Sequence, residues 1–312
     1  MGSYYKKKLG AKVYKVPIAL SGFTCPNIDG TKAKGGCTFC ENESFSPNYN
    51  KSKEKLYLSS LKANESLLEK QIAELREQFN KTTKALKKTH NAKKFIVYFQ
   101  AFTNSYAPLE TLKKLYEEAL SLKGVVGISI GTRADSVNDE LLSYLKELSN
   151  VSEVWVEYGV QSVKDETLTL INRAEIAKDV LAIVKKTHDM GLQVCTHFIF
   201  GLPNESKEDM LYTVKETLKC GIDSIKIHPL YVVKNTALAN DYKTKKFTPI
   251  TQEEYIDTLV DTVKLLPDNI IVQRVSAGIS DDSLLAPSWC GESKNAQMKK
   301  IKTALNKSGF DY

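Results

Sequence analysis

The chain has 312 residues, of which 42% are hydrophobic and 26% charged, and its net charge is +7. These values are typical of a globular protein, and the length suits one large barrel-type domain or two ordinary domains. No apolar run is long enough to span a membrane, and no apolar segment follows the basic N-terminus as a signal peptide would require. We therefore expect a cytoplasmic protein with no membrane partner.

Lysine carries most of the positive charge, because the chain has only four arginines, Arg76, Arg133, Arg173 and Arg274. A lysine-rich surface fits a solvated face as well as a phosphate-binding face, so charge alone does not identify a nucleic-acid partner. The scarcity of arginine is more informative. Each guanidinium can occupy a position that needs a planar, bidentate donor.

Three of the six cysteines, Cys25, Cys37 and Cys40, lie in one glycine-bounded loop at 22–41, directly after an apolar segment that we predict to be a strand. Three thiolates close in sequence suit a soft metal or an iron–sulfur cluster. The missing fourth thiolate leaves one coordination position open for a ligand, which distinguishes a reactive site from a structural one. This loop is the first candidate site.

After the loop, apolar residues recur at helical spacing and predict a long amphipathic helix over 56–88, with Leu61, Leu68, Ile72, Leu75 and Phe79 on one face. From there, β-rich runs alternate with helical segments. The predicted strands are 95–101, 125–131, 154–160, 193–200 and 224–230, and the predicted helices lie near 108–122, 137–148, 165–171, 175–190 and 206–219. A helix at 251–266, a possible strand at 269–275 and a helix from about Asn295 follow as a C-terminal extension at about 251–312.

With the strand before Cys25, this pattern gives six βα repeats. It predicts an α/β fold in which parallel strands with right-handed crossovers close as a barrel or part of one. A doubly wound sheet is the alternative, but no phosphate-binding glycine motif follows any predicted strand. Nothing resembles a linker, so we expect residues 1–312 to form a single domain.

Polar side chains occur near the carboxyl ends of several predicted strands, where the reactive groups of a βα barrel gather. Alternate residues of a strand share a face, so Glu157, Gly159 and Gln161 point the same way, which suits a lumen that holds a polar ligand. Other strands place further polar groups at the same end, namely Tyr98, Gln100, Ser129, Arg133, Cys195, His197, Lys226 and His228.

Each of these residues also has a simpler interpretation. Glu157 and Arg133 can form an internal ion pair, and a single histidine on a strand is more often structural than catalytic. Cys195 and Cys220 are expected to be buried small hydrophobes, and Cys290 is ambiguous and could be a surface thiol. The convergence of polar groups on adjacent strands is what favours a functional site.

The ordered set of motifs resembles a radical S-adenosylmethionine (SAM) enzyme of the elongator-subunit-3-like branch, and within it the YhcC/YtqA subfamily. Eleven residues separate Cys25 from Cys37, a spacing typical of this branch. The remaining blocks are Tyr98-Phe-Gln-Ala-Phe-Thr-Asn-Ser-Tyr106, Gly131-Thr-Arg133, Val156-Glu-Tyr-Gly-Val-Gln-Ser162, Thr196-His-Phe-Ile-Phe-Gly-Leu-Pro203 and His228-Pro-Leu-Tyr-Val-Val-Lys234.

The resemblance implies a partial (β/α)6 TIM-type barrel, a [4Fe–4S] cluster on Cys25, Cys37 and Cys40, and SAM bound to the fourth iron. It places Phe39 near the cluster and adenine, Gln161 at the SAM ribose, and Arg173 at the SAM carboxylate, where a bidentate donor fits. The full set of expected cofactor-binding residues is Phe39, Gln100, Thr103, Asn104, Arg133, Glu157, Gln161, Arg173 and His197.

The chain departs from the family pattern at two places. The family usually reads Asn-Arg-Asp-Gly where this chain has Asn27-Ile-Asp-Gly30, and Arg-Gly-His where it has Arg173-Ala174-Glu175. The arginine is kept but the histidine is replaced. The role of that histidine therefore does not carry over, and we expect substrate handling nearby to differ.

The resemblance also implies the reaction. An electron from the reduced cluster cleaves SAM to methionine and a 5′-deoxyadenosyl radical, which abstracts hydrogen from an unactivated C–H bond. A flavodoxin- or ferredoxin-type reductant would supply the electron. The branch acts on wobble uridine of tRNA, and the subfamily is associated with maturation of the C5 side chain, such as carboxymethylaminomethyl to aminomethyl conversion. We expect His197, His228 and Tyr231 to be catalytic residues on the substrate side of SAM, with lysines binding tRNA phosphates.

Two other functions remain open. The same radical chemistry could act on a small molecule or a protein. Alternatively, the chain could be a non-enzymatic binding protein in which the three cysteines hold structural zinc, with His90 or Cys290 as the fourth ligand.

Overall fold

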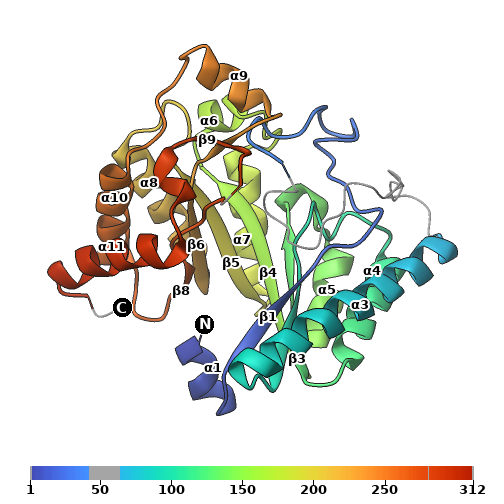
Figure 1. Ribbon diagram of the computed structural model, residues 1–312. Helices are drawn as coiled ribbons and strands as arrows, with labels where there is room; N and C mark the ends of the chain where they lie inside the picture. Colours follow the sequence, from blue (N-terminus) through green and yellow to red (C-terminus); the bar gives the residue numbers. More distant parts are fainter. Residues whose placement is uncertain (1, 42–63, 280, 311–312) are drawn as a thin grey trace.

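Seven parallel strands form one curved sheet in the computed structural model, which describes residues 2–41, 64–279 and 281–310. Their order is β1-β2-β3-β4-β5-β6-β8, so β1 and β8 are the two free edges and the sheet is an open half-barrel (Figure 1). The bounds are β1 Val13–Ile18, β2 Lys94–Phe99, β3 Val125–Thr132, β4 Glu153–Gln161, β5 Gln193–Phe200, β6 Ser224–Pro229 and β8 Ile271–Arg274.

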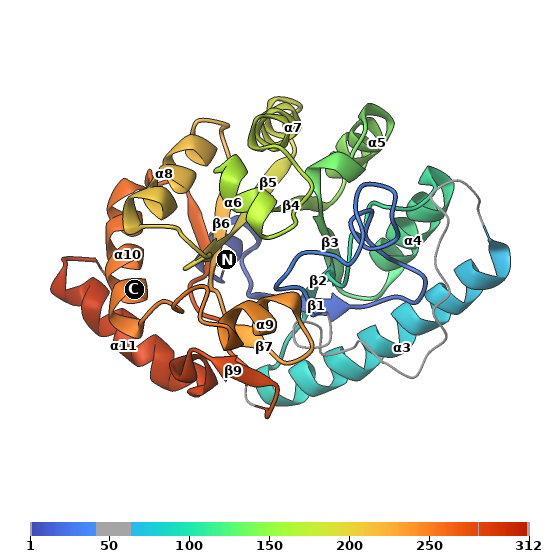
Figure 2. The ribbon, with the colours of Figure 1, turned by 90° about the horizontal axis from the view of Figure 1, so that it is seen from above.

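Helices cover the outer face of this sheet and follow its curve, as Figure 2 shows from above. Their apolar faces pack on the strands, and this burial supplies most of the stability of such helices. They are α3 Glu65–His90, α4 Leu109–Ser121, α5 Asp139–Ser149, α7 Ala177–Asp189, α8 Lys207–Leu218 and α10 Gln252–Leu265. The short helix α6 (Asp165–Leu170) lies over the carboxyl ends of the strands, and α11 (Lys294–Lys307) packs against α10. Within the described ranges, no helix is both long and apolar enough to cross a membrane.

The long helix α3 begins later than the sequence pattern predicts. Asn64 is its N-cap, with extended backbone and a side chain that accepts a hydrogen bond from the backbone N–H of Leu67 at 3.0 Å. The prediction started the helix at residue 56, but residues 56–63, including Leu61, lie outside the described residues. The apolar face itself is confirmed, because Leu68, Leu75 and Phe79 are buried.

A short helix that sequence analysis did not predict, α1 (Gly2–Leu9), lies beneath the amino ends of the strands (Figure 1). Tyr5 of this helix is 1% exposed, and its hydroxyl accepts a hydrogen bond from the indole N–H of Trp155 at 2.8 Å. Lys8 forms an ion pair with Glu153 at 2.7 Å. These contacts place α1 across the lower end of the barrel, away from the carboxyl ends of the strands.

The C-terminal part of the chain adds a two-stranded antiparallel ribbon, β7 (Val232–Val233) with β9 (Leu284–Ala286), and the helix α9 (Ala237–Lys243). Figure 2 shows these elements on the open side of the half-barrel, opposite α5 and α7. They are too short to leave a periodic pattern in the sequence, and none was predicted.

The predicted partial barrel is confirmed, and the doubly wound alternative is wrong. Strands β1 to β6 follow one another across the sheet in chain order, whereas a doubly wound sheet reverses its strand order at a switch point. The possible strand at 269–275 is β8, which adds a seventh strand after β6.

Candidate active site

The cysteine loop lies at the carboxyl end of β1, and its own hydrogen bonds fix its shape. The backbone N–H of Gly36 donates to the carbonyl of Asn27 at 2.8 Å, and the N–H of Cys40 donates to the carbonyl of Cys37 at 2.9 Å. Gly35 and Gly36 have φ of 85° and 77°, a left-handed conformation that glycine adopts without strain. This turn brings Cys37 back toward Cys25.

Two asparagines attach the loop to the segment after α6. The side chain of Asn27, which is fully buried, donates to the carbonyl of Asn172 at 2.5 Å. The side chain of Asn172 donates in return to the carbonyl of Gly36 at 2.8 Å. Because Arg173 is the next residue, this exchange fixes Arg173 relative to the cysteines.

Cys25, Cys37 and Cys40 line one cavity of about 170 Å³. Its other walls come from the carboxyl ends of β2 to β5 and from the segment after α6. They include eight of the residues expected to bind cofactor, namely Phe39, Gln100, Thr103, Arg133, Glu157, Gln161, Arg173 and His197. Asn104 does not line the cavity. Its amide donates to the carbonyls of Ala101 and Gly131 at 3.0 and 3.1 Å and so holds the turn behind the wall.

The three thiols fit an iron–sulfur cluster. All six cysteines are free of disulfides. Burial, with the neighbouring thiols of Cys37 and Cys25, raises the pKa of the Cys40 thiol to about 12, so grouped thiolates need a cationic centre at this position. The guanidinium of Arg173 and the amide of Asn27 lie 3.8 and 3.5 Å from the sulfur of Cys37, as donors that would stabilise a cluster-bound thiolate.

The cavity also fits the carboxylate of SAM. Arg133 and Arg173 are both buried, and Nη1 of Arg133 and Nε of Arg173 have no hydrogen-bond partner in the described part of the chain. Gly159 keeps the space between them and β4 open, because a Cβ there would lie 2.7 Å from Nε2 of Gln161 and 3.4 Å from Nη2 of Arg173. Gln161 has φ of 66° at a bulge in β4 and lines the cavity.

Glu175, which stands where the family usually has histidine, joins the two arginines. Its carboxylate lies 2.7 Å from Nη2 of Arg173 and 3.4 Å from Nη2 of Arg133, and Arg133 also pairs with Asp135 at 2.8 Å. The interpretation of Glu157 and Arg133 as an internal ion pair is therefore wrong. Ala174 has φ of 53°, a conformation that the usual glycine would adopt more easily.

Glu157 occupies the centre of the lumen and is fully buried. It accepts hydrogen bonds from Lys15 of β1, Ser129 of β3 and Lys226 of β6, and it contacts Nε2 of His197 in β5 at 2.8 Å. Burial alone would raise the pKa of the Glu157 carboxyl, but Lys15 and Lys226 hold that pKa well below its usual range. Glu157 is therefore ionised and ties four other strands together.

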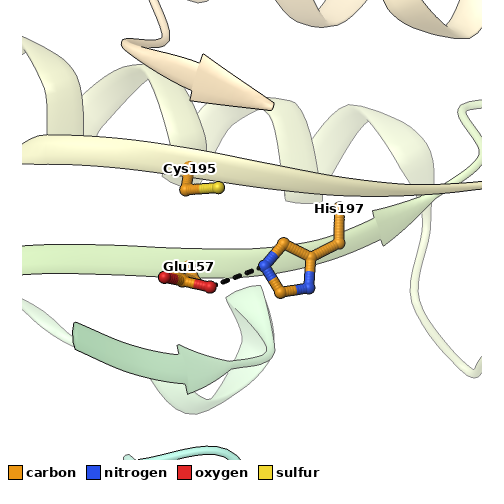
Figure 3. Close-up of side chains that lie close together, drawn as sticks. All are labelled: Glu157, Cys195 and His197. Atoms are coloured by element: carbon orange, nitrogen blue, oxygen red, sulfur yellow. Dashed lines mark hydrogen bonds and ion pairs between the residues drawn. The ribbon is translucent and has the colours of Figure 1, made fainter. Parts of the chain in front are cut away.

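Figure 3 shows Glu157, Cys195 and His197 converging, with potential ligand atoms within 4.8 Å of one another. This arrangement does not suit a metal cation. Two lysine ammonium groups already neutralise Glu157, and burial raises the pKa of the Cys195 thiol to about 12. As expected, Cys195 and Cys220 are buried.

A second cavity, of about 570 Å³, shares walls with the cysteine cavity at Tyr98, Gln100, Phe102, Gln161 and His197, together with Phe39. The predicted catalytic residues His197, His228 and Tyr231 all line it.

Both histidines are neutral at pH 7. Burial, then the charge of Lys226, lowers the pKa of His197 to about 4, and burial, then Arg274, lowers that of His228 well below its usual value. The rings lie 6.2 Å apart, centroid to centroid. Neutral imidazoles can each donate and accept a hydrogen bond.

The residues expected to complete a zinc site lie elsewhere. His90 stacks on Tyr14 at the start of β1, with ring centroids 5.5 Å apart, at the opposite end of the strand from the cysteine loop. Cys290 is fully buried beside Tyr231 and Val233 and is not a surface thiol. Neither residue lines the cysteine cavity, so the structure offers no support for the predicted fourth ligand.

Sequence reasoning missed several polar and charged residues of the lumen and its rim. Lys15, Gln273 and Glu175 were not singled out as site residues, although Lys15 contacts Glu157, Glu175 contacts Arg173, and Gln273 accepts a hydrogen bond from Lys15. Lys15 carried a usable signal, because a charge inside an otherwise apolar β run is the same feature that identified Glu157.

Comparison with known proteins agrees with this site. Residues 29–217 match the Radical SAM superfamily, and residues 222–307 match the Radical_SAM C-terminal domain. Protein YhcC of Escherichia coli (strain K12) is 34% identical over 310 residues, which cover 99% of this chain and 92% of YhcC. YtqA of Bacillus subtilis is 34% identical over 286 residues, covering 92% of this chain and 83% of YtqA.

Among solved structures, the Elp3 protein of Methanocaldococcus infernus superposes with a TM-score of 0.61 at 18% identity, covering 96% of this chain but 64% of that longer one. This chain belongs to the radical SAM superfamily and resembles its YhcC/YtqA members, as the motifs predicted. It is a radical SAM enzyme, and its cofactors are a [4Fe–4S] cluster and SAM.

Proposed function

We propose that this enzyme modifies the C5 side chain of wobble uridine in tRNA, in a reaction of the carboxymethylaminomethyl to aminomethyl type. The observation that carries the proposal is the junction of the two cavities. The cysteine cavity shares walls with a cavity of about 570 Å³, a volume within the range of small-ligand sites and suited to one nucleobase with its side chain.

Relatives that match part of the chain support an RNA substrate. The tRNA uridine(34) acetyltransferase of Methanocaldococcus infernus is 28% identical over 174 residues, covering 55% of this chain and 32% of that protein. Elongator complex protein 3 of Schizosaccharomyces pombe is 28% identical over 157 residues. The net charge of +7 agrees with a polyanionic partner, whose phosphates lysines would hold.

In this proposal, Cys25, Cys37 and Cys40 hold the cluster, and Arg173 and Arg133 hold the SAM carboxylate through their unpaired donors. When bound, the cluster and SAM supply one-electron chemistry that ends in hydrogen abstraction from the substrate. A flavodoxin- or ferredoxin-type protein delivers the electron in the cytoplasm. Both cofactors would then lie at the end of the lumen where the two cavities meet.

The large cavity positions the base. His197 and His228 are neutral and offer hydrogen bonds to its polar edge, while the Tyr231 hydroxyl, whose pKa is raised by burial, stays protonated. These groups would decide which C–H bond faces SAM, without themselves carrying charge.

Nucleoside profiling of tRNA by mass spectrometry tests the proposal. A deletion strain should accumulate the unprocessed wobble uridine, and the wild-type gene and the Cys220→Ala variant should restore the product. Cys37→Ala should not restore it. Unaltered wobble nucleosides in the deletion strain would instead favour a small-molecule or protein substrate.

The substrate-side role of His228 has its own readout. His228→Ala should lose tRNA product while it still cleaves SAM without coupling to substrate, because it leaves the thiols and arginines of the cysteine cavity intact. Wild-type product formation in this variant would assign His228 a structural role only.

A further inference from the structure

Arg274 differs from the other three arginines in having no acidic partner within the described ranges. Arg76 forms a bidentate pair with Glu118 at 2.7 and 2.9 Å on the surface. Arg133 and Arg173 are both committed to Glu175. A guanidinium in a cavity wall without a carboxylate is free to bind an anion.

The position of Arg274 directs it toward the substrate side. Arg274 is the last residue of β8 and pairs in register with Lys226 of β6. Both residues line the large cavity, and neither lines the cysteine cavity. Arg274 lines the same cavity as His228 and Tyr231, and its charge contributes to the lowered pKa of His228.

The charges around this wall leave positive charge uncompensated. Lys15, Lys226 and Arg274 lie on the strands around the lumen, and Glu157 is the carboxylate that the two lysines share. The carboxylate at the rim, Glu292, is already paired with Lys300 at 2.6 Å. Burial lowers the pKa of Lys15 to about 8, whereas Arg274 is exposed in the cavity wall and presents its guanidinium to whatever enters the cavity.

The first turn of α11 completes the wall. Ser293 caps this fourteen-residue helix, and Ser293, Lys294 and Gln297 all line the cavity. The positive end of the helix dipole therefore faces the cavity, where it favours an anion. Gln297 is 3% exposed, its Nε2 donates to the carbonyl of Glu292 at 3.1 Å, and its Oε1 has no partner in the described chain. A ligand group that carries a hydrogen-bond donor beside its anion would satisfy both features.

We propose that Arg274, with Lys226 and the first turn of α11, forms a subsite for an anionic group of the substrate, a carboxylate or a phosphate. The subsite deepens the proposed function and rests on it in one respect, since the anion is taken to belong to the molecule that reacts. The subsite would hold that molecule at a wall of the large cavity that is separate from the cysteine cavity. It would thereby make the enzyme selective for charged over neutral substrates.

Small anions test the subsite without any RNA. Acetate and inorganic phosphate are titrated calorimetrically into the reconstituted enzyme with SAM bound, so that Arg173 is already occupied. Wild type should take up one of the two anions, which identifies a carboxylate or a phosphate site. Arg274→Gln should bind it at least about tenfold more weakly, as expected for loss of a charge-assisted pair. The matched control Arg76→Gln, with the same charge change on the surface, should bind as wild type.

Unchanged SAM affinity shows that Arg274→Gln is folded, and Arg274→Lys, which keeps the charge, should bind the anion more tightly than the glutamine variant. Equal anion affinity in wild type and Arg274→Gln, or no uptake by wild type at tens of millimolar, overturns the subsite whatever the substrate proves to be.

An RNA hairpin then separates the subsite from the proposed substrate. The hairpin carries a uridine with a C5 carboxymethylaminomethyl group, and its methyl ester is the neutral comparison. Wild type should lose about tenfold or more in affinity on esterification, and Arg274→Gln should show no such loss. Esterification that costs both proteins equally would contradict the subsite. If acetate binds at Arg274 but the enzyme ignores the hairpin, the subsite stands and the tRNA proposal fails.

Discussion

Lys15 in β1 donates a hydrogen bond of 2.8 Å to Gln273 in β8, across the side on which the half-barrel is open. The backbones of these edge strands do not pair, so side chains make the connection there. The same ammonium group also donates to Glu157 on the central strand. One polar network thus spans the lumen from the first strand to the last, and its members Glu157 and Lys226 line the cavities in which we place the cofactors and the substrate.

Replacing Glu157 by glutamine tests how much this network contributes to the free energy of unfolding. Glu157→Gln leaves two buried lysines without their carboxylate, and we expect the free energy of unfolding to fall by about 3–5 kcal/mol in equilibrium denaturation. Glu118→Gln, which removes the partner of the surface residue Arg76, is the matched control and should cost no more than about 1 kcal/mol. A loss as small as that of the control would mean that Glu157 is not needed to hold the strands together. The double variant Glu157→Gln with Lys15→Met should recover part of the loss.

The lowered pKa of His197 predicts that the free energy of unfolding depends on pH. Its pKa of about 4 lies below the usual 6.5, so between these values the unfolded chain binds a proton that the folded chain does not. The contribution of His197 is therefore complete above about pH 6.5 and is lost as the pH falls toward 4, which lowers the free energy of unfolding by up to about 3 kcal/mol. Urea unfolding at a series of pH values measures this slope. The slope should flatten in His197→Gln, and an identical slope in both proteins would exclude His197 as its source.

The position of Arg173 predicts that its removal weakens SAM binding but leaves the cluster in place. Arg173→Ala removes a buried guanidinium, including the donor 3.8 Å from the sulfur of Cys37, but keeps all three thiols as ligands. We therefore expect SAM affinity to drop about tenfold or more at unchanged iron content. Equilibrium dialysis with SAM and an iron assay give the two readings.

Glu175→Gln provides the comparison for this prediction. It removes the negative charge that holds Arg173 and Arg133 but leaves both guanidinium groups in place, so the loss of affinity should be smaller than in Arg173→Ala. If Arg173→Ala binds SAM as wild type does, Arg173 is not part of the SAM site.

Local patterns of the sequence predicted the repeating part of the fold but not the elements that close it. Strands β2 to β6 follow β-rich apolar runs, and the helices between them have regular apolar faces, so their order and parallel direction could be inferred. The helix α1 could not, because it is a short lysine-rich segment that is stabilised by Tyr5 packing on Trp155, a contact between residues 150 positions apart.

In the candidate site, too, local patterns predicted some features, and long-range contacts determined the others. Alternation along the strands correctly directed Glu157, Gln161 and His197 into one lumen. The partners of Glu157 could not be inferred, because they come from four other strands and depend on the curvature of the sheet. For that reason the sequence suggested Arg133 as the partner, whereas the structure pairs Arg133 with Asp135 and Glu175.

The central claim is that the three thiols of the glycine-bounded loop hold the cluster at the mouth of the barrel, and anaerobic reconstitution tests it most directly. Wild type and Cys220→Ala, whose buried thiol does not line the cysteine cavity, should each take up about four irons and four sulfides per chain. Cys25→Ala, Cys37→Ala and Cys40→Ala should each lose the cluster. A full cluster in Cys37→Ala would contradict the account.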